Sequence, residues 1–474
     1  MAASAYLARK TIRDIVAEGD AGEHKLARNL GPWSITAMGI GAIIGAGIFV
    51  LTGTAAAQYA GPGVMLSFVF AGIACAFVGL CYAELASMIP VSGSCYTYTY
   101  ATLGEIFAWI IGWDLILEYA MGAATVAVGW SGYVVSLLAN FGLVLPPGLT
   151  RPPLNLPAAA IVLILTALLV RGTKESARVN NLMVAIKLVV VVAFIAIGAG
   201  HVHPENWTPL VPANSGEFGH YGWSGVLRGA AVVFFAFIGF DAVSTAAQES
   251  RRPSRDMPIG ILGSLVVCTL LYVAVAAVLT GLVPYTQLDV PDPIAKGIDA
   301  IGVGWLSVAV KLGALVGLTT VILVLLFGQT RVFLAMSRDG LMPPVFARIH
   351  ARWHTPVWSQ TLIGVIVALV ATTLPIHILG EMVSIGTLFA FILVCGAVLH
   401  LRRSEPDAPR PFRVTGLPWV PLLGIVCCLA LMAGLPLDTW LRLVVWLLIG
   451  LAIYFGYGRH HTALARRDPP APIR

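Results

Sequence analysis

The chain has 474 residues, of which 58% are hydrophobic and 11% are charged, and its formal net charge is +6. A soluble protein is about 45–50% apolar and about 25% charged, so this composition excludes a soluble domain, a disordered chain and a coiled coil. The mean hydropathy of +0.87 instead predicts an integral membrane protein.

Twelve continuous apolar runs follow a polar N-terminal tail, residues 1–33, which contains no signal-peptide pattern. A membrane-crossing helix needs about 20 apolar residues, so the chain has room for about twelve of them. Because the runs are continuous rather than alternating, they predict helices and an all-α fold. They cover residues 34–58, 64–89, 106–138, 156–170, 182–200, 229–247, 258–283, 306–330, 357–374, 378–399, 417–434 and 440–457.

Lysine and arginine concentrate in both tails and in alternate connections between the runs. Positively charged residues next to membrane helices stay on the cytoplasmic side. Both termini, including the C-terminal tail over residues 460–474, are therefore predicted to be cytoplasmic. The same asymmetry explains the positive net charge without a nucleic-acid partner.

Glycines interrupt the first apolar run, which contains Gly39, Gly41, Gly45 and Gly47. Each glycine weakens a helix interior by about 1 kcal/mol relative to alanine, so a continuous helix is not expected. Close helix packing is the alternative, because Gly41 and Gly45 form a G-x-x-x-G pair. The sixth run has a similar interruption, with Gly239 two residues before an acidic side chain.

Interruptions in the first helix of each half of the chain are typical of secondary transporters built from inverted repeats. A break exposes N–H groups that favour a carboxylate, and it exposes carbonyl groups that favour an ammonium. Because lipid satisfies neither kind of group, the breaks must line a cavity in the protein. Both ends together suit an α-amino acid.

Ionisable residues inside the runs each need a partner, because a charge at the bilayer centre costs about 2.5–3.5 kcal/mol on insertion scales. Lys311 lies near the end of its run and is expected to extend towards the membrane surface. Glu84 is expected to cap its helix or to pair locally. The remaining four are Asp114, Glu118, Lys187 and Asp241.

Several segments, in the right order, resemble the amino acid–polyamine–organocation (APC) superfamily, and among its members the bacterial relatives of cationic amino acid transporters. The resemblance implies two inverted repeats of five helices, over residues 34–200 and 224–401, with helices 1 and 6 unwound. Two peripheral helices follow over 416–459. The matching segments are Gly39–Phe49, Pro90–Tyr96, Gly112–Tyr119, Phe237–Ala242, Glu249–Pro253, Met257–Pro258, Gln329–Arg331 and Ser337–Gly340.

The resemblance also implies a substrate site at the two breaks. The substrate carboxylate is expected on the N–H groups of Gly45, Ala46 and Gly47, and the ammonium on carbonyls near Ile43 and of Phe235 and Ile238. Related transporters often have serine where this chain has Ala46, so one hydroxyl contact is absent. Phe235 is expected to cover the substrate as an aromatic gate, with ordinary packing as the alternative.

Coupling to protons is implied by Lys187, which matches a lysine that the family places where sodium-coupled relatives hold sodium. Its ammonium is expected to donate to carbonyls near Gly41 and to the hydroxyls of Thr319 or Thr320. Extension to the membrane surface is the alternative for Lys187. Glu118 matches an acidic position that faces the substrate, where it contacts an ammonium or takes part in proton movement. Asp241 matches an acidic position in the sixth run, where it is a second protonatable group or a cap on the broken helix.

The sequence therefore predicts a proton-driven importer of free amino acids in a bacterial inner membrane, working by alternating access. It predicts no cofactor and no metal, with the proton gradient as the driving force. An amino acid or polyamine exchanger and a transporter-like nutrient sensor are the alternatives. An enzyme is not expected, because the clusters that membrane enzymes need are missing. The bilayer is the expected partner, and the sequence leaves open whether a small membrane subunit binds.

Overall fold

The structure is a computed structural model that describes residues 30–90, 94–172, 177–241, 243–244, 247, 250–353 and 355–462. The predicted N-terminal and C-terminal tails lie mostly outside these residues. So do parts of three of the segments that carry the family resemblance, at residues 91–93, 242 and 249.

The described chain is mostly helical, and its one sheet pairs β1 (Thr150–Arg151) with β2 (Leu154–Asn155). The helices of the first half are α3 (Pro32–Ile43), η1 (Gly47–Leu51), α4 (Thr52–Ala55), η2 (Ala56–Ala60), η3 (Gly61–Gly63), α5 (Val64–Met88), α6 (Ser94–Thr102), α7 (Glu105–Asn140), η4 (Pro147–Leu149), α8 (Leu156–Arg171), α9 (Ala177–Gly198), η5 (Ala199–His201) and η6 (Pro204–Trp207).

The second half continues with further helices in the same arrangement of long apolar segments and short connections. They are α10 (Gly222–Val233), η7 (Phe234–Phe237), α11 (Pro253–Leu282), η9 (Tyr285–Gln287), α12 (Pro293–Ile301), α13 (Gly304–Arg338), η10 (Pro344–Ala347), α14 (Val357–Thr373), α15 (Ile376–Ser404), α16 (Trp419–Ala433), α17 (Leu437–Ile453), η11 (Tyr454–Gly458) and α18 (Arg459–His461).

Helices occupy all twelve predicted apolar runs. In the described part of the chain, seven helical stretches are long and apolar enough to cross a membrane, and four shorter apolar helices accompany them. The fold is therefore all-α and built for a membrane, as the composition predicts. Apolar side chains exposed on the outer helices, such as Leu441 and Leu448 of α17, suit contact with lipid.

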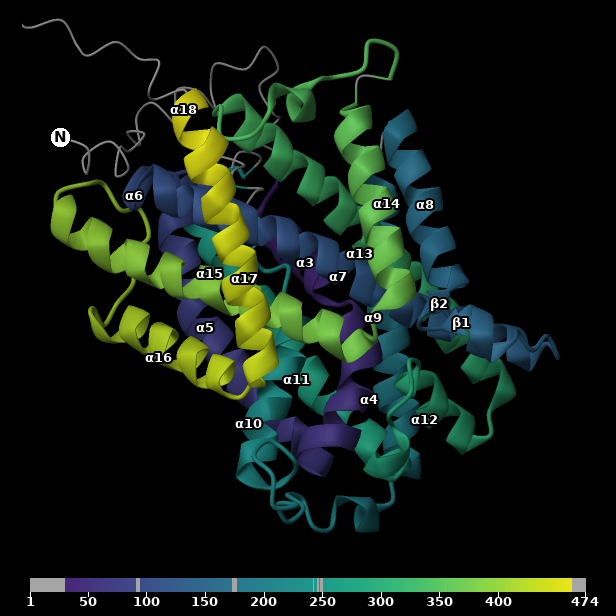
Figure 1. Cartoon of the computed structure of the whole chain (residues 1–474). Coiled ribbons are helices and arrows are strands. Elements are labelled where there is room, and N and C mark those ends of the chain that lie inside the picture. Colours follow the sequence, from purple (N-terminus) through teal and green to yellow (C-terminus); the bar gives the residue numbers. More distant parts are fainter. Residues whose placement is uncertain are drawn as a thin grey trace, which may run out of the picture.

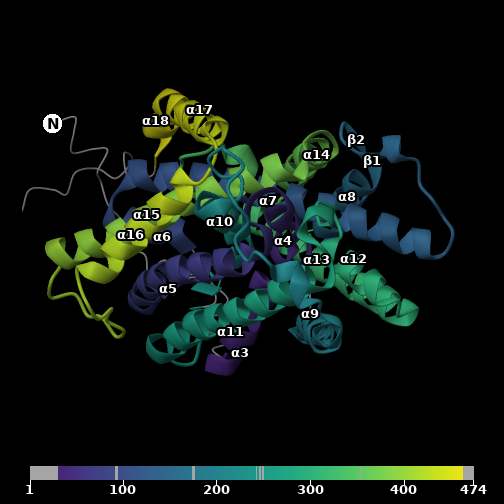
Figure 2. The same ribbon diagram turned by 90° about the horizontal axis from the view of Figure 1, so that it is seen from below.

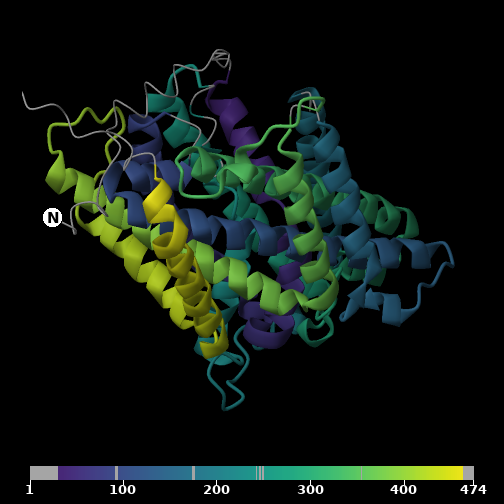
Figure 3. The same cartoon turned by 45° about the horizontal axis from the view of Figure 1, so that its top comes forward.

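The helices form a bundle whose two ends are here called the terminal face and the distal face. The terminal face carries α18, and the distal face carries α12 and the connection between α9 and α10 (Figure 1). Seen from below, α4 and α7 lie near the middle of the bundle (Figure 2). Helices α16 and α17 lie at one side of the bundle, and α8 with the β-hairpin lies at the other (Figure 3).

The helix α17 is fastened to α7 by tryptophans. The indole N–H of Trp113 donates to the carbonyl of Trp446 over 2.8 Å, and the indole of Trp446 donates back to the carbonyl of Trp113 over 3.1 Å. Their rings stack with centroids 4.5 Å apart. One turn away, Trp109 donates to the carbonyl of Gly450 over 2.9 Å. A Cβ on Gly450 would lie 2.3 Å from Trp113, so only glycine permits this approach.

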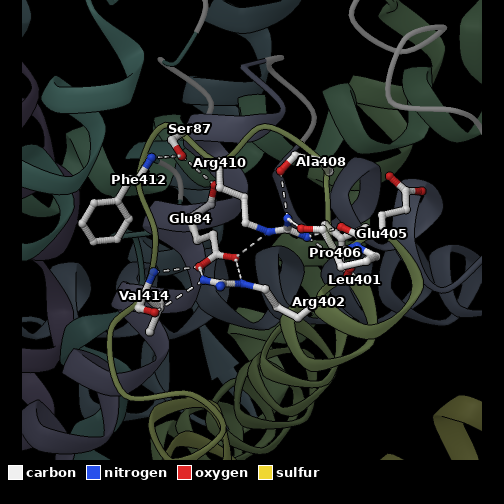
Figure 4. Close-up of polar contacts among 10 residues, drawn as sticks. All are labelled: Glu84, Ser87, Leu401, Arg402, Glu405, Pro406, Ala408, Arg410, Phe412 and Val414. Carbon is white, nitrogen blue, oxygen red and sulfur yellow. Dashed lines mark hydrogen bonds and ion pairs between the residues drawn. The ribbon is translucent and has the colours of Figure 1, made fainter.

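Glu84 forms a buried ion cluster with Arg402 and Arg410 (Figure 4). Its carboxylate accepts two hydrogen bonds from Arg402, over 2.8 and 2.6 Å, and one from the N–H of Val414 over 2.8 Å. Arg410 lies 3.5 Å away as a second cation. Glu84 is only 1% exposed. The expectation of a local partner is therefore wrong, because both arginines lie more than 300 residues further along the chain.

Replacing Arg402 by alanine is expected to destabilise the fold by about 3–5 kcal/mol, because it leaves a buried carboxylate without its bidentate partner. Thermal unfolding of the purified protein measures the effect. The matched control is Arg403→Ala, since Arg403 is exposed and has no ion pair within the described residues. Equal stability of the two variants would contradict a structural role for the cluster.

Lys311 does not extend to the membrane surface, contrary to the expectation from its place in the run. Its side chain is 1% exposed, and its ammonium lies 3.0 Å from the carboxylate of Asp299 and 3.0 Å from the amide oxygen of Asn140. Ser307 also donates to Asp299. This network joins α12 to α13 and α7, so the lysine fastens a distal connection to the bundle.

Candidate functional site

The first apolar run is broken in the middle of the bundle. Helix α3 ends at Ile43, and Ile44 adopts an extended conformation with ψ of 103°. The next half helix has its first hydrogen bond from the N–H of Phe49 to the carbonyl of Gly45, over 3.3 Å. The N–H groups of Ala46 and Gly47 precede that bond, so they are among the donors that a helix start leaves without an intrahelical acceptor.

Glycine serves close packing at the same place. A Cβ on Gly41 would lie 2.3 Å from Val184 of α9. The two interpretations of the glycine run therefore apply together, because a break and a close helix contact occur within the same few residues.

The second break follows α10 and η7. Ile238 is extended, with ψ of 135°, and Gly239 has φ of +113°, a conformation that disfavours other residues. The N–H of Gly239 donates to the carboxylate of Asp241 over 3.2 Å. A Cβ on Gly239 would lie 2.7 Å from the carbonyl oxygen of Ala42, so the second break lies directly against the end of α3.

The two breaks also touch through Gly47 and Ala236. A Cβ on Gly47 would lie 2.1 Å from the Cα of Ala236 and 2.3 Å from its Cβ. No rotamer relieves a clash with backbone, so any larger residue at Gly47 must push η1 and η7 apart. The residues predicted to bind the substrate from these two segments are thus brought together, and Ala46 and Phe235 are both buried.

Tyr272 of α11 bridges the breaks, and sequence reasoning missed it. Its hydroxyl lies 2.8 Å from the carbonyl oxygen of Ile43 and 2.9 Å from that of Ala236, and the side chain is fully buried. One O–H group is thus shared between two carbonyls that the interruptions release. A tyrosine within an otherwise mainly aliphatic run was the available signal.

The variant Tyr272→Phe is expected to lose about 1–3 kcal/mol of stability and to transport more slowly, because both carbonyls lose their donor. Thermal unfolding and initial uptake rates measure the two effects. Tyr285→Phe is the control, since the Tyr285 hydroxyl has no hydrogen bond in the described part of the chain. Wild-type uptake by Tyr272→Phe would show that the bridge does not matter for function.

Lys187 reaches the first break from α9. Its ammonium donates to the carbonyls of Gly41, over 3.0 Å, and Ile44, over 3.2 Å. Its aliphatic chain packs on Gly317 of α13, where a Cβ would lie 3.2 Å away. The side chain is 2% exposed, so in this conformation it does not extend to the membrane surface.

The hydroxyls of Thr319 and Thr320 are used within their own helix. Thr319 donates to the carbonyl of Leu315, and Thr320 donates to that of Gly317, each over 2.7 Å. The indole of Trp130 donates to the Thr319 hydroxyl over 3.0 Å. The structure describes no hydrogen bond from Lys187 to either threonine.

Three carboxylates lie buried in the helical bundle. Glu118 is 2% exposed, and its Oε1 has no hydrogen-bond partner among the described residues. Asp241 is 3% exposed and faces the Gly239 N–H. Both carboxylate oxygens of Asp114 are buried without a hydrogen-bond partner among the described residues, and a Cβ on Gly386 would lie 2.9 Å from one of them.

These observations define a site with free N–H groups, free or shared carbonyls, one buried lysine and nearby carboxylates. Such a set can bind a small zwitterion and exchange protons. Within the described residues, no group of three or more His, Cys, Asp or Glu side chains is placed to hold a metal ion.

Comparison with known proteins gives a consistent result. The profile of the family described as "Amino acid permease" matches residues 30–455. The branched-chain amino acid permease BcaP of Bacillus subtilis is 50% identical over 96% of this chain and 98% of its own length. The methylthioribose transporter of Bacillus subtilis is 46% identical over 93% of this chain and 95% of its own length. The chloroplastic cationic amino acid transporter 9 of Arabidopsis thaliana is 39% identical over 80% of this chain and 67% of its own length.

Proposed function

The chain belongs to the amino acid permease family of the APC superfamily, and we propose that it imports free amino acids by proton symport. The observation that carries this proposal is the contact between the two breaks at Gly47 and Ala236. It brings the N-terminal N–H groups of one half helix next to the carbonyls of another. Zwitterions need both kinds of group within a few ångströms, and no continuous helix offers them.

In this proposal the substrate carboxylate binds the N–H groups of Gly45, Ala46 and Gly47. The carbonyls of Ile43, Phe235 and Ile238 receive the ammonium. The carbonyl of Ile43 already accepts a hydrogen bond from the Tyr272 hydroxyl, and the carbonyl of Phe235 accepts one from the N–H of Ile238 over 3.2 Å. A carbonyl oxygen has two lone pairs, so each retains room for the ammonium. The Phe235 ring then covers the substrate.

Lys187 is the proposed coupling group. When its amine is protonated, the resulting ammonium binds the Gly41 and Ile44 carbonyls and holds the end of α3 in place. Loss of the proton removes the charge that these bonds depend on. Proton release and the movement of α3 are thereby linked. Glu118 and Asp241 are further proton acceptors close to the cargo.

Alternating access requires the broken helices to move relative to the rest of the bundle. The proposal includes the twelve crossings, the two inverted repeats and a terminal face that lies in the cytoplasm. Support comes from the basic residues that gather at this face, including Arg402, Arg403 and Arg410. The distal face is then the side from which the amino acid arrives.

Branched-chain aliphatic amino acids are the cargo to test first, because the relative at 50% identity is named as their permease. The buried Phe235 and the aliphatic Ile43 suit an apolar side chain. Lysine and arginine test the influence of Glu118, and methylthioribose tests the likeness to a carrier of that compound.

The deciding experiment is uptake of radiolabelled L-isoleucine into proteoliposomes with an imposed pH gradient. Uphill accumulation that a protonophore abolishes is expected. Counterflow without any gradient effect would favour the exchanger, and tight binding without flux would favour the sensor. Inhibition of isoleucine uptake by the other nineteen amino acids and methylthioribose then ranks the cargo.

A further inference from the structure

A second polar pocket opens at the distal face, away from the breaks. Its volume is about 270 Å³. Drug-sized ligands occupy pockets of about 300–1,000 Å³, so this one suits a smaller molecule. We propose that it is a recruitment site that binds a free zwitterionic α-amino acid before the molecule moves to the breaks. The lining residues are Gln58, Tyr59, Arg228, His377, Ile378, Glu381, Pro436, Asp438 and Arg442.

The charges of this recruitment site match a zwitterion. Arg228 and Arg442 are positive, and Glu381 and Asp438 are negative. An α-amino acid likewise carries one carboxylate and one ammonium on the same carbon. A purely anionic or cationic ligand would match only one sign of the charges that line the pocket. The Ile378 side chain adds an apolar surface for the side chain of the ligand.

The charged groups also retain capacity for a ligand. Asp438 and Arg442 lie four residues apart on the same side of α17, yet neither side chain has a hydrogen bond or ion pair in the described part of the chain. The guanidinium of Arg228 lies 3.7 Å from the carboxylate of Glu381, which exceeds a hydrogen bond, and its Nε is buried without an acceptor among the described residues. An arginine binds a carboxylate best through two parallel N–H groups.

The recruitment site is continuous with the elements that lead to the breaks. Arg228 lies on α10, seven residues before Phe235. The two residues are therefore about 10 Å apart along the helix axis. The Arg228 guanidinium stacks 4.4 Å from the ring of Tyr59, which belongs to η2 and the half helix that starts at the first break. The pocket therefore lies about two helical turns from the second break along α10.

The recruitment site rests on the proposed function for the direction of transport. Equilibrium binding of radiolabelled L-isoleucine to the full chain in lipid nanodiscs tests it, together with uptake into proteoliposomes. Two bound molecules per chain are expected for the wild type and for Arg151→Gln, a matched exposed arginine of β1. Arg442→Gln and Asp438→Asn are each expected to bind one, and to raise KM about tenfold with kcat unchanged, because one charge-assisted contact is lost.

Modified ligands and lipids identify the occupant. Isoleucinamide lacks the carboxylate and N-acetylisoleucine lacks the ammonium, so each is expected to compete at least about tenfold more weakly at this site. Phosphatidylethanolamine carries both charges on a lipid headgroup. If isoleucine binding is the same in nanodiscs with and without this lipid, the ligand is the free amino acid. One fewer bound isoleucine in its presence identifies a headgroup site and overturns the proposal.

Failure of the recruitment site is separable from failure of the proposed function. A wild type that transports isoleucine but binds a single molecule overturns the recruitment site alone, as does wild-type stoichiometry and KM in both pocket variants. A wild type that accumulates no amino acid counts against proton-coupled import, and its binding stoichiometry still decides the recruitment site.

Discussion

Replacement of Lys187 by methionine is expected to abolish uphill uptake driven by a pH gradient while leaving counterflow measurable. Methionine preserves much of the aliphatic contact with Gly317 but supplies neither a charge nor a donor. The carbonyls of Gly41 and Ile44 then lose hydrogen bonds to a charged group, each worth about 1.5–3 kcal/mol. The position of α3 no longer depends on a proton, so the gradient has no group to act on.

Proteoliposomes loaded at one pH and diluted into another measure this effect directly. Lys296→Met is the matched control, because the ammonium of Lys296 binds the carbonyl of Gln287 in the distal connection, over 2.6 Å. The control is expected to accumulate isoleucine normally. If Lys187→Met still concentrates isoleucine on a proton gradient alone, coupling must reside elsewhere, with Glu118 and Asp241 as the next groups to test.

The variant Gly47→Ala is expected to reduce transport by at least tenfold, which corresponds to about 1.4 kcal/mol. The added methyl carbon would lie 2.1 Å from the Cα of Ala236, so η1 and η7 must separate. Overpacking of this kind costs about 1–3 kcal/mol. The N–H groups at the first break then move away from the carbonyls at the second. The ligand therefore loses the contacts to one of its two charged ends.

Initial uptake rates and isoleucine affinity measure this loss, and gel filtration shows whether the variant is folded. Gly456→Ala is the control, because a Cβ on Gly456 of η11 meets nothing within 4 Å. A folded Gly47→Ala protein with wild-type uptake would mean that the contact between the breaks is not where the substrate binds.

Local chemistry explains which parts of the site the sequence predicts. A glycine weakens the helix at its own position. The run around Gly45 and the lone Gly239 therefore indicate the two interruptions without any knowledge of packing. Lys187 is conspicuous for a related reason, since a charge within an apolar run requires a partner. Its ammonium donates to the carbonyls of Gly41 and Ile44, within the interrupted run itself.

Contacts between distant segments escape such reasoning. Glu84 and Arg402 pair across 318 positions of the chain, and nothing near Glu84 indicates its partner. Lys311 has the depth of a residue that reaches the membrane surface, but Asp299 of the folded α12 supplies a nearer partner. The role of Tyr272 as a bridge arises only from the packing of α11 across both breaks. Each of these depends on helix arrangement, which apolar periodicity does not specify.

The tryptophan contacts of α17 imply that this last helix is needed to keep α7 compatible with lipid. Trp109 and Trp113 place their indole N–H groups on carbonyls of α17. A chain truncated before Leu437 would turn both donors towards hydrocarbon, where no acceptor replaces the lost carbonyls. The peripheral helix thus acts as a permanent cover for the polar edge of a central one, and it must travel with α7 whenever that helix tilts.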